Sequence, residues 1–124
     1  MSNSETVKVN IKPEAADKIK GQVKDGQVVL LSLNDGSNKY SDVGGTCTVG
    51  SSFQFVILDQ KDPDYTIEVE NNAGLDLYTS PAEMQYLGDG LVVDEKNAAM
   101  SLADDGGVID GAVTVNEYLS LIHI

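Results

Sequence analysis

The stretch SFQFVIL (Ser52–Leu58) decides how this chain is expected to fold. Its two phenylalanines and its isoleucine occupy every second position, which is the periodicity of a β-strand with one face in a core. The apolar run QVVLLSL (27–33) precedes it, and the alternating segment YTIEVE (65–70) follows it. Segments rich in glycine, aspartate and asparagine separate these runs, as turns do. The centre of the chain is therefore predicted to be a series of short strands.

Two helices are predicted around these strands. In KPEAADKIKGQVKDG the proline suits a first helical turn and apolar residues recur at helical spacing, so we predict a helix from Pro13 to Val23. The segment SPAEMQYLGDG (80–90) offers a serine cap followed by proline, which predicts one or two helical turns. Beyond it, residues 91–107 read as two extended pieces and VIDGAVTV (108–115) as a last hairpin-like pair.

The order of these elements indicates the fold class. A doubly wound α/β fold needs a helix between successive strands, and this chain places most strands directly one after another. We therefore expect an α+β fold of short mixed β-sheets, with one N-terminal amphipathic helix and one short inserted helix. No internal repeat or linker is visible, so residues 1–124 are expected to form a single domain. The expected core is Ile19, Val23, Val29, Leu31, Phe53, Phe55, Ile57, Ile67, Val69, Leu87 and Val93.

The charge of the chain limits its partners. Eight lysines and no arginine stand against 20 acidic residues, so the net charge is −12. Nucleic acid and anionic membranes attract basic patches, and neither is expected as a partner, whereas a basic protein is compatible with this charge. The N-terminus lacks the regions of a signal peptide, and no apolar run approaches the roughly 20 residues of a membrane span. We expect a cytoplasmic protein.

Few side chains are suited to catalysis. The single histidine, His123, lies beside the C-terminus, where a catalytic base for a serine or cysteine nucleophile is hard to position. Cys47 and His123 are too few for a zinc site, and the glycine motifs that bind phosphate are missing. The acidic clusters match no calcium-loop pattern and read as solvated turns. We therefore predict that the protein is not an enzyme.

The only cysteine, Cys47, lies in the glycine-rich stretch SDVGGTCTVGSS (41–52). Gly44, Gly45 and Gly50 are expected to shape a loop with the thiol at or near the surface, because ordering glycines costs entropy and leaves few side chains to pack. A thiolate in such a loop is suited to holding iron or copper, or to receiving sulfur. The alternative is that Cys47 is an inert, small apolar residue.

Three segments together resemble the HesB-like family, the A-type carriers of iron–sulfur cluster biosynthesis. They are the helix with AADKIKGQV (15–23), the loop GGTC (44–47) and the aromatic strand FQFVILD (53–59). The likeness covers about residues 6–115, which leaves residues 116–124 as a tail. Three interpretations of this tail stay open: it docks on the core, it pairs with another subunit, or it is not native. The resemblance implies a HesB-like fold and makes Cys47 a metal ligand.

The chain departs from these carriers near its carboxyl end. The carriers have a cysteine pair there, and this chain reads ADDGGVIDGAVTV (103–115). A cluster held by four thiolates needs more than one cysteine per chain, so outside thiols such as glutathione, or oxygen ligands from Asp104, Asp105 or Asp110, would have to complete it.

The resemblance thus implies weak or lost binding of iron or an iron–sulfur cluster through Cys47. Other proteins are the expected partners, an assembly protein or a basic surface, and a homodimer is left open. The alternative is an acidic protein-interaction module that uses the same fold and in which Cys47 is inert.

Overall fold

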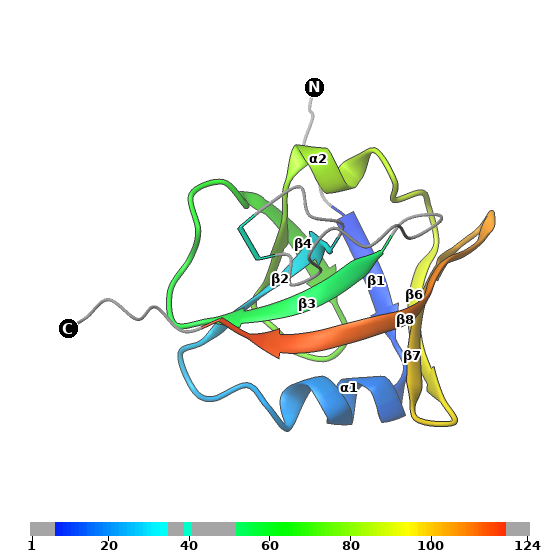
Figure 1. Cartoon of the computed structure of the whole chain (residues 1–124), viewed down its shortest axis with the longest axis horizontal. Helices are drawn as coiled ribbons and strands as arrows, with labels where there is room; N and C mark the ends of the chain where they lie inside the picture. Colours follow the sequence, from blue (N-terminus) through cyan, green and yellow to red (C-terminus); the bar gives the residue numbers. More distant parts are fainter. Residues whose placement is uncertain (1–6, 35–38, 41–51, 119–124) are drawn as a thin grey trace.

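The structure, a computed structural model, describes residues 7–34, 39–40 and 52–118 (Figure 1). The helices and strands of this part of the chain are, in order, β1 (Val7–Ile11), α1 (Pro13–Lys20), β2 (Val28–Leu33), β3 (Phe53–Leu58), β4 (Ile67–Asn71), β5 (Leu77–Thr79), α2 (Pro81–Met84), β6 (Leu91–Lys96), β7 (Ala99–Asp104) and β8 (Gly107–Glu117). The strands form one closed barrel in the order β1-β4-β5-β2-β3-β8-β7-β6.

The barrel closes because β1 pairs with a strand on each side. Its first residues pair in parallel with β4, where Val7 faces Val69, and its last residues pair in parallel with β6, where Ile11 faces Val93. Parallel pairs also join β2 to β5 and β3 to β8. The pairs β4–β5, β6–β7 and β7–β8 are antiparallel, as expected for strands joined by short turns. β2 and β3 are also antiparallel, although residues 34–52 separate them along the chain.

The predicted fold class is wrong, because the strands do not form separate short sheets. We expected an α+β fold of short mixed sheets, and the described strands instead form one mixed barrel accompanied by two helices. A period of two residues looks the same in an open sheet and in a barrel, because both alternate inward and outward positions. Closure depends on the pairing of β1 with β4 and β6, which lie far along the chain and leave no local pattern.

The segment predicted as a last hairpin is a single strand, β8 (Figure 1). The dipeptide DG at Asp110 is typical of a hairpin turn. In the structure Leu102 of β7 faces Asp110 and Met100 faces Val113, so β8 carries one extra residue over this interval. Such an irregularity is a β-bulge, which bends a strand without reversing it.

Both predicted helices are present, with one shorter than expected. α1 ends at Lys20 instead of Val23, and it buries Ala15 and Ile19 at one end of the barrel (Figure 1). α2 confirms the short inserted helix, with Ser80 at its N-cap position. The Ser80 hydroxyl makes no cap bond to a backbone N–H and instead donates to the carboxylate of Glu83.

The main core lies inside the barrel, and most of the predicted core belongs to it. The predicted residues that are buried there are Ile19, Val29, Leu31, Phe53, Phe55, Ile57, Val69 and Val93. Val23, Ile67 and Leu87 are partly buried and pack against this core.

A second cluster covers the outer face of β2 and β3. Every residue of these two strands is buried, so both faces of the pair are covered. Leu30 and Val56 pack on this outer face with two aromatic residues, Tyr40 and Tyr65. β2 and β3 are also the strands on either side of residues 35–51, which include Cys47.

Candidate functional site

The residues predicted from the sequence to form the site lie outside the described part of the chain. Cys47, the predicted metal ligand, and Gly44, Gly45 and Gly50, predicted to shape its loop, fall in residues 41–51. Their predicted roles therefore stay predictions. The structure does describe the chain that flanks them, namely the end of β2, residues 39–40 and the start of β3.

The flanking chain is joined by hydrogen bonds between segments. The Asn34 backbone N–H donates to the Ser52 carbonyl at 2.7 Å. The buried Gln54 amide donates from Nε2 to the carbonyls of Leu33 (3.2 Å) and Tyr40 (2.9 Å). Gln54 Oε1 in turn accepts from Asn116 Nδ2 of β8 at 2.9 Å. The stretches on both sides of residues 41–51 are therefore tied to one another.

The carboxylate of Glu83 lies against the end of β2. Its side chain is 1% exposed, and Oε2 accepts the Leu33 N–H at 2.9 Å. Oε1 accepts the Ser80 hydroxyl. Both oxygens therefore have hydrogen-bond partners, as a buried carboxylate requires.

A second carboxylate, that of Asp110, lies against the start of β3. Oδ2 accepts the Phe53 N–H at 2.7 Å, and Oδ1 accepts the Ala112 N–H at 2.9 Å within the bulge of β8. The bulge thus turns Asp110 toward β3 at the point where β3 emerges from residues 41–51. Figure 1 shows β8 running alongside β3 beyond this point.

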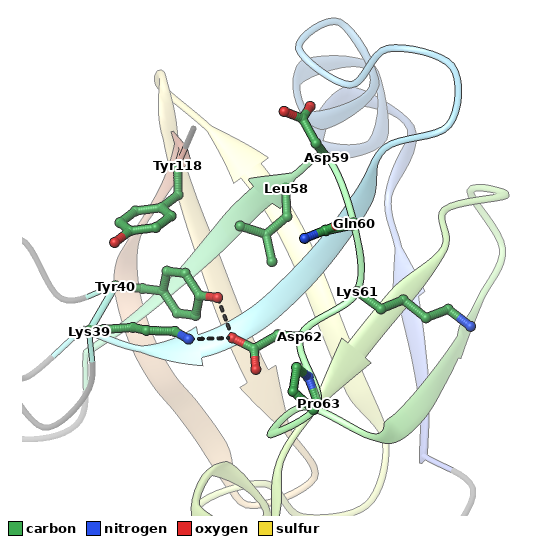
Figure 2. A pocket seen from close by; sticks show the side chains of 9 residues that line it. All are labelled: Lys39, Tyr40, Leu58, Asp59, Gln60, Lys61, Asp62, Pro63 and Tyr118. Carbon is green, nitrogen blue, oxygen red and sulfur yellow. Dashed lines mark hydrogen bonds and ion pairs between the residues drawn. The ribbon is translucent and has the colours of Figure 1, made fainter. Parts of the chain in front are cut away.

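A pocket of about 510 Å³ lies beside residues 39–40 (Figure 2). Its buried acid is Asp62, which accepts from the Tyr40 hydroxyl and the Asp64 N–H and pairs with Lys39 Nζ at 3.1 Å. Figure 2 shows Lys39 and Tyr40 converging on Asp62, while Lys61 points away from it. Tyr118 packs edge-on against the Tyr40 ring, with 4.7 Å between ring centroids.

The protonation of this pocket follows from its hydrogen bonds. Burial by itself raises the pKa of the Asp62 carboxyl, but the bonds from Tyr40 and Asp64 and the nearby Lys39 outweigh it and hold that pKa below its usual range. Burial and the adjacent Asp62 raise the pKa of Tyr40. Burial raises the pKa of Tyr65 to about 12, against the opposing effect of its hydrogen bond with Ser32. At neutral pH Asp62 is therefore a carboxylate, while Tyr40 beside it and Tyr65, which packs against Tyr40 in the outer cluster, are neutral phenols.

The described residues do not supply a metal site. No group of three or more Asp, Glu, Cys or His side chains in residues 7–34, 39–40 and 52–118 is placed to hold an ion. Asp104 and Asp110, considered above as oxygen ligands, accept backbone N–H groups with both oxygens; for Asp104 these are Gly88 (3.0 Å) and Gly106 (2.8 Å). The hairpin of β7 and β8 therefore uses these carboxylates to hold backbone.

Sequence reasoning missed the polar residues that surround the site. Gln54 occupies an outward position of an alternating strand, which normally faces water. Glu83 lies in a segment predicted as a helix of one or two turns, and Asp62 lies in a polar stretch between two predicted strands. One local signal was present: a serine three residues before a glutamate, at Ser80 and Glu83, is the capping-box pattern. It identifies the helix start but not the burial of the carboxylate.

A family model described as iron-sulphur cluster biosynthesis matches residues 7–117. The chain belongs to the iron-sulphur cluster biosynthesis family. This confirms the family predicted from the helix, the GGTC loop and the aromatic strand.

Two solved structures share the fold of this family member. One, described as a putative Fe-S biosynthesis protein from Lactobacillus acidophilus, has a TM-score of 0.76 and 28% identity, over 90% of each chain. The other, described as a putative Fe-S biosynthesis protein from Lactobacillus salivarius with novel protein fold, has a TM-score of 0.74 and 22% identity, over 92% of this chain and all of the other. No curated protein matches the sequence significantly. Neither described helix has the length and apolar character of a membrane span.

Proposed function

We propose that this protein is a non-enzymatic member of the iron–sulfur cluster biosynthesis family that binds iron or a cluster weakly, through Cys47. The observation that carries the proposal is the family match over residues 7–117 in a chain with a single cysteine. One chain offers one thiolate, and two chains offer two, whereas iron–sulfur clusters are ordinarily held by four. A bound cluster therefore depends on thiols from another molecule.

The hydrogen bonding of the β7–β8 hairpin supports weak rather than strong binding. Carboxylates at Asp104 and Asp110 already accept two backbone N–H groups each, so recruiting them to iron breaks those bonds. Carboxylate oxygens are also hard ligands that suit mononuclear iron better than sulfide clusters. The thiolate of Cys47 is then the chain's main contribution to an iron site.

The chemistry of the pocket supports a role without catalysis. A general acid or base works best with a pKa near the working pH. The pKa of Asp62 lies below its usual range and that of Tyr40 lies above its usual range, so neither group exchanges protons readily near neutrality. The charge of −12 supports a protein partner with a basic surface. We propose that this partner is bound in the cytoplasm, either by a single chain or by a homodimer.

Anaerobic reconstitution tests this function. Full-length protein is incubated with ferrous iron, sulfide and glutathione, which supplies the outside thiols, and is then desalted and examined by visible absorption, with Cys47→Ser as the matched variant. We expect a weak chromophore, well below one cluster per two chains, that the variant does not form. A full complement of cluster, or equal absorption in Cys47→Ser, contradicts the proposal.

A second candidate is an acidic protein-interaction module with an inert Cys47. The engagement of Asp104 and Asp110 with backbone favours it, because the hairpin is then ordered without any metal. A colourless reconstituted protein supports this candidate. It also requires binding to a basic partner that weakens as salt rises, because exposed charge pairs are screened.

A further inference from the structure

We propose that one edge of β8, at Val115 and Glu117, binds an extended, basic segment of another protein, which adds to the barrel as a further strand. β8 pairs with β3 along its first edge from Thr114 to Glu117. Along its other edge, β8 pairs with β7 no further than Val113. The free edge follows from the described strand pairing, whereas the choice of a basic partner rests on the function proposed above.

The turn between β6 and β7 is the reason that β8 loses its second neighbour. Lys96 pairs with Ala99, so Asn97 and Ala98 alone reverse the chain, with left-handed φ angles of 53° and 67°. β7 therefore begins at Ala99 and cannot follow β8 any further. The last residues of β8 run past this turn, and none of the described strands pairs with them on that edge.

The main-chain groups of Val115 and Glu117 point to this free edge. Successive residues of a strand direct their N–H and C=O groups to opposite edges. The Tyr118 N–H donates to the Ile57 carbonyl of β3 at 3.0 Å, so Asn116, two residues earlier, also faces β3. Val115 and Glu117 then face away from β3, and the described hydrogen bonds leave their main-chain groups unused. Such an edge is a template for another strand.

A groove of about 440 Å³ lies along this edge. Residues 112–116 of β8 line it, with Lys18 and Gln22 on the side of α1 and Ala98 and Ala99 at the turn. Figure 1 shows β8 with β3 on one side and α1 on the other. Because the edge lies between a helix and a turn, it admits a single extended chain. The same edge of a second copy lies in its own groove, so two such edges cannot meet.

The charge around the groove favours a basic segment. Lys18 Nζ pairs with Glu95 Oε2 at 3.2 Å, so the positive charge at the groove wall is already compensated. Glu117 is exposed and forms no ion pair within the described part of the chain. A segment that alternates apolar and basic residues fits, because its apolar side chains pack beside the partly buried Val115 and its charges meet Glu117. A second copy, with the same net charge of −12, is repelled.

Amide hydrogen exchange in the full-length protein tests the edge without any ligand. We expect the N–H groups of Val115 and Glu117 to exchange at least about tenfold faster than that of Asn116, which β3 holds. Equal rates for Val115 and Asn116 in dilute protein mean that another part of the same chain already covers the edge, which overturns the proposal. Protection of Val115 that appears only as the protein concentration rises identifies a second copy as the occupant and also overturns it.

A short peptide then tests the partner. The probe is a pentapeptide of alternating lysine and valine, KVKVK, with both ends blocked, and its binding is followed by the NMR shifts of the Val115 and Glu117 amides. We expect a Kd below about 1 mM, and binding at least about tenfold weaker when both valine nitrogens are methylated or when glutamate replaces lysine. Absence of binding, or equal affinity for the methylated peptide, overturns strand addition. Equal affinity for the glutamate peptide overturns the basic partner.

A variant that fills the groove completes the test. Ala99→Tyr places a ring in the groove, and the matched control Val108→Tyr places the same ring at an exposed position of β8 outside it. We expect KVKVK to bind at least about tenfold more weakly to Ala99→Tyr and within about twofold of wild type to Val108→Tyr. Equal binding to both variants overturns the proposal, and if Ala99→Tyr fails to fold, the methylated peptide decides. None of these measurements involves iron, so their failure and the failure of iron binding are separate results.

Discussion

The two faces of the β2–β3 pair are buried to the same degree but held together by different forces. The inner face presents Leu31, Phe53, Phe55 and Ile57 to the barrel core, and its stability comes from removing apolar surface from water. The outer face mixes leucine and valine with Gln54 and a hydroxyl network, and its polar atoms must each find a partner. The first face tolerates apolar exchange, whereas the second depends on particular hydrogen bonds.

The largest expected effect belongs to the inner face. Phe55→Ala removes a fully buried ring and leaves a cavity, so the free energy of unfolding should fall by about 3–5 kcal/mol in urea denaturation. Val108→Ala on the exposed part of β8 is the control and should stay within about 0.5 kcal/mol of wild type. A loss below about 1 kcal/mol for Phe55→Ala argues that the barrel interior is not the main core.

On the outer face, Gln54→Met keeps the length of the side chain and removes its polar atoms. The carbonyls of Leu33 and Tyr40 then lose this donor, so we expect a loss of about 1–3 kcal/mol despite the more apolar side chain. Asn116→Ala removes only the outer member of the network and should cost less. Equal or greater stability of Gln54→Met would show that this face behaves like the inner one.

The buried acid of the outer face should make stability depend on pH. The pKa of Asp62 is lower in the folded chain than its ordinary value, so its contribution is present above about pH 4 and is lost as pH falls through the lower, folded-state value. Asp62→Asn is therefore expected to be about 1–2 kcal/mol less stable at pH 7, with a difference that narrows below pH 4. Urea denaturation of the wild type and Asp62→Asn at pH 7 and below pH 4 measures this difference in the free energy of unfolding. A difference that is larger at the acidic pH contradicts the prediction.

The smallest effects concern the lysines. Lys39 pairs at 3.1 Å with the buried Asp62, whereas Lys8 pairs at 4.0 Å with the exposed Glu70. We expect Lys39→Ala to cost up to about 1 kcal/mol and Lys8→Ala almost nothing, because exposed ion pairs are screened by water and salt. The melting temperatures of the two variants, measured under the same conditions, make this comparison. A larger decrease for Lys8→Ala than for Lys39→Ala contradicts the prediction.

The contrast between the faces also explains what the sequence could reveal. Alternation of large apolar residues predicts the inner face, since burial follows directly from hydrophobicity, and Phe53, Phe55 and Ile57 are buried as predicted. The burial of Gln54 depends on Tyr40, Tyr65 and neighbouring chain covering the outer face, which no local pattern encodes. Barrel closure through β1 and the DG bulge at Asp110 were missed for the same reason, because both depend on distant partners.

The candidate site likewise has a part that could be predicted from the sequence and a part that could not. The motif-bearing segment GGTC pointed to the family, and the match over residues 7–117 confirms it. The sequence suggests Asp110 only as a possible oxygen ligand and assigns no role to the Glu83 carboxylate, because an acidic residue in a short helix or next to a glycine is usually solvated. Their roles emerge only when β2 and β3 are seen to end beside them.

The iron and sulfide content of freshly purified protein tests the central claim most directly. Wild type and Cys47→Ser are purified anaerobically under identical conditions and assayed for both elements per chain. The account predicts a small, substoichiometric amount of iron in the wild type and none in Cys47→Ser, since the chain supplies a single thiolate. A full iron–sulfur cluster that survives in Cys47→Ser would contradict it.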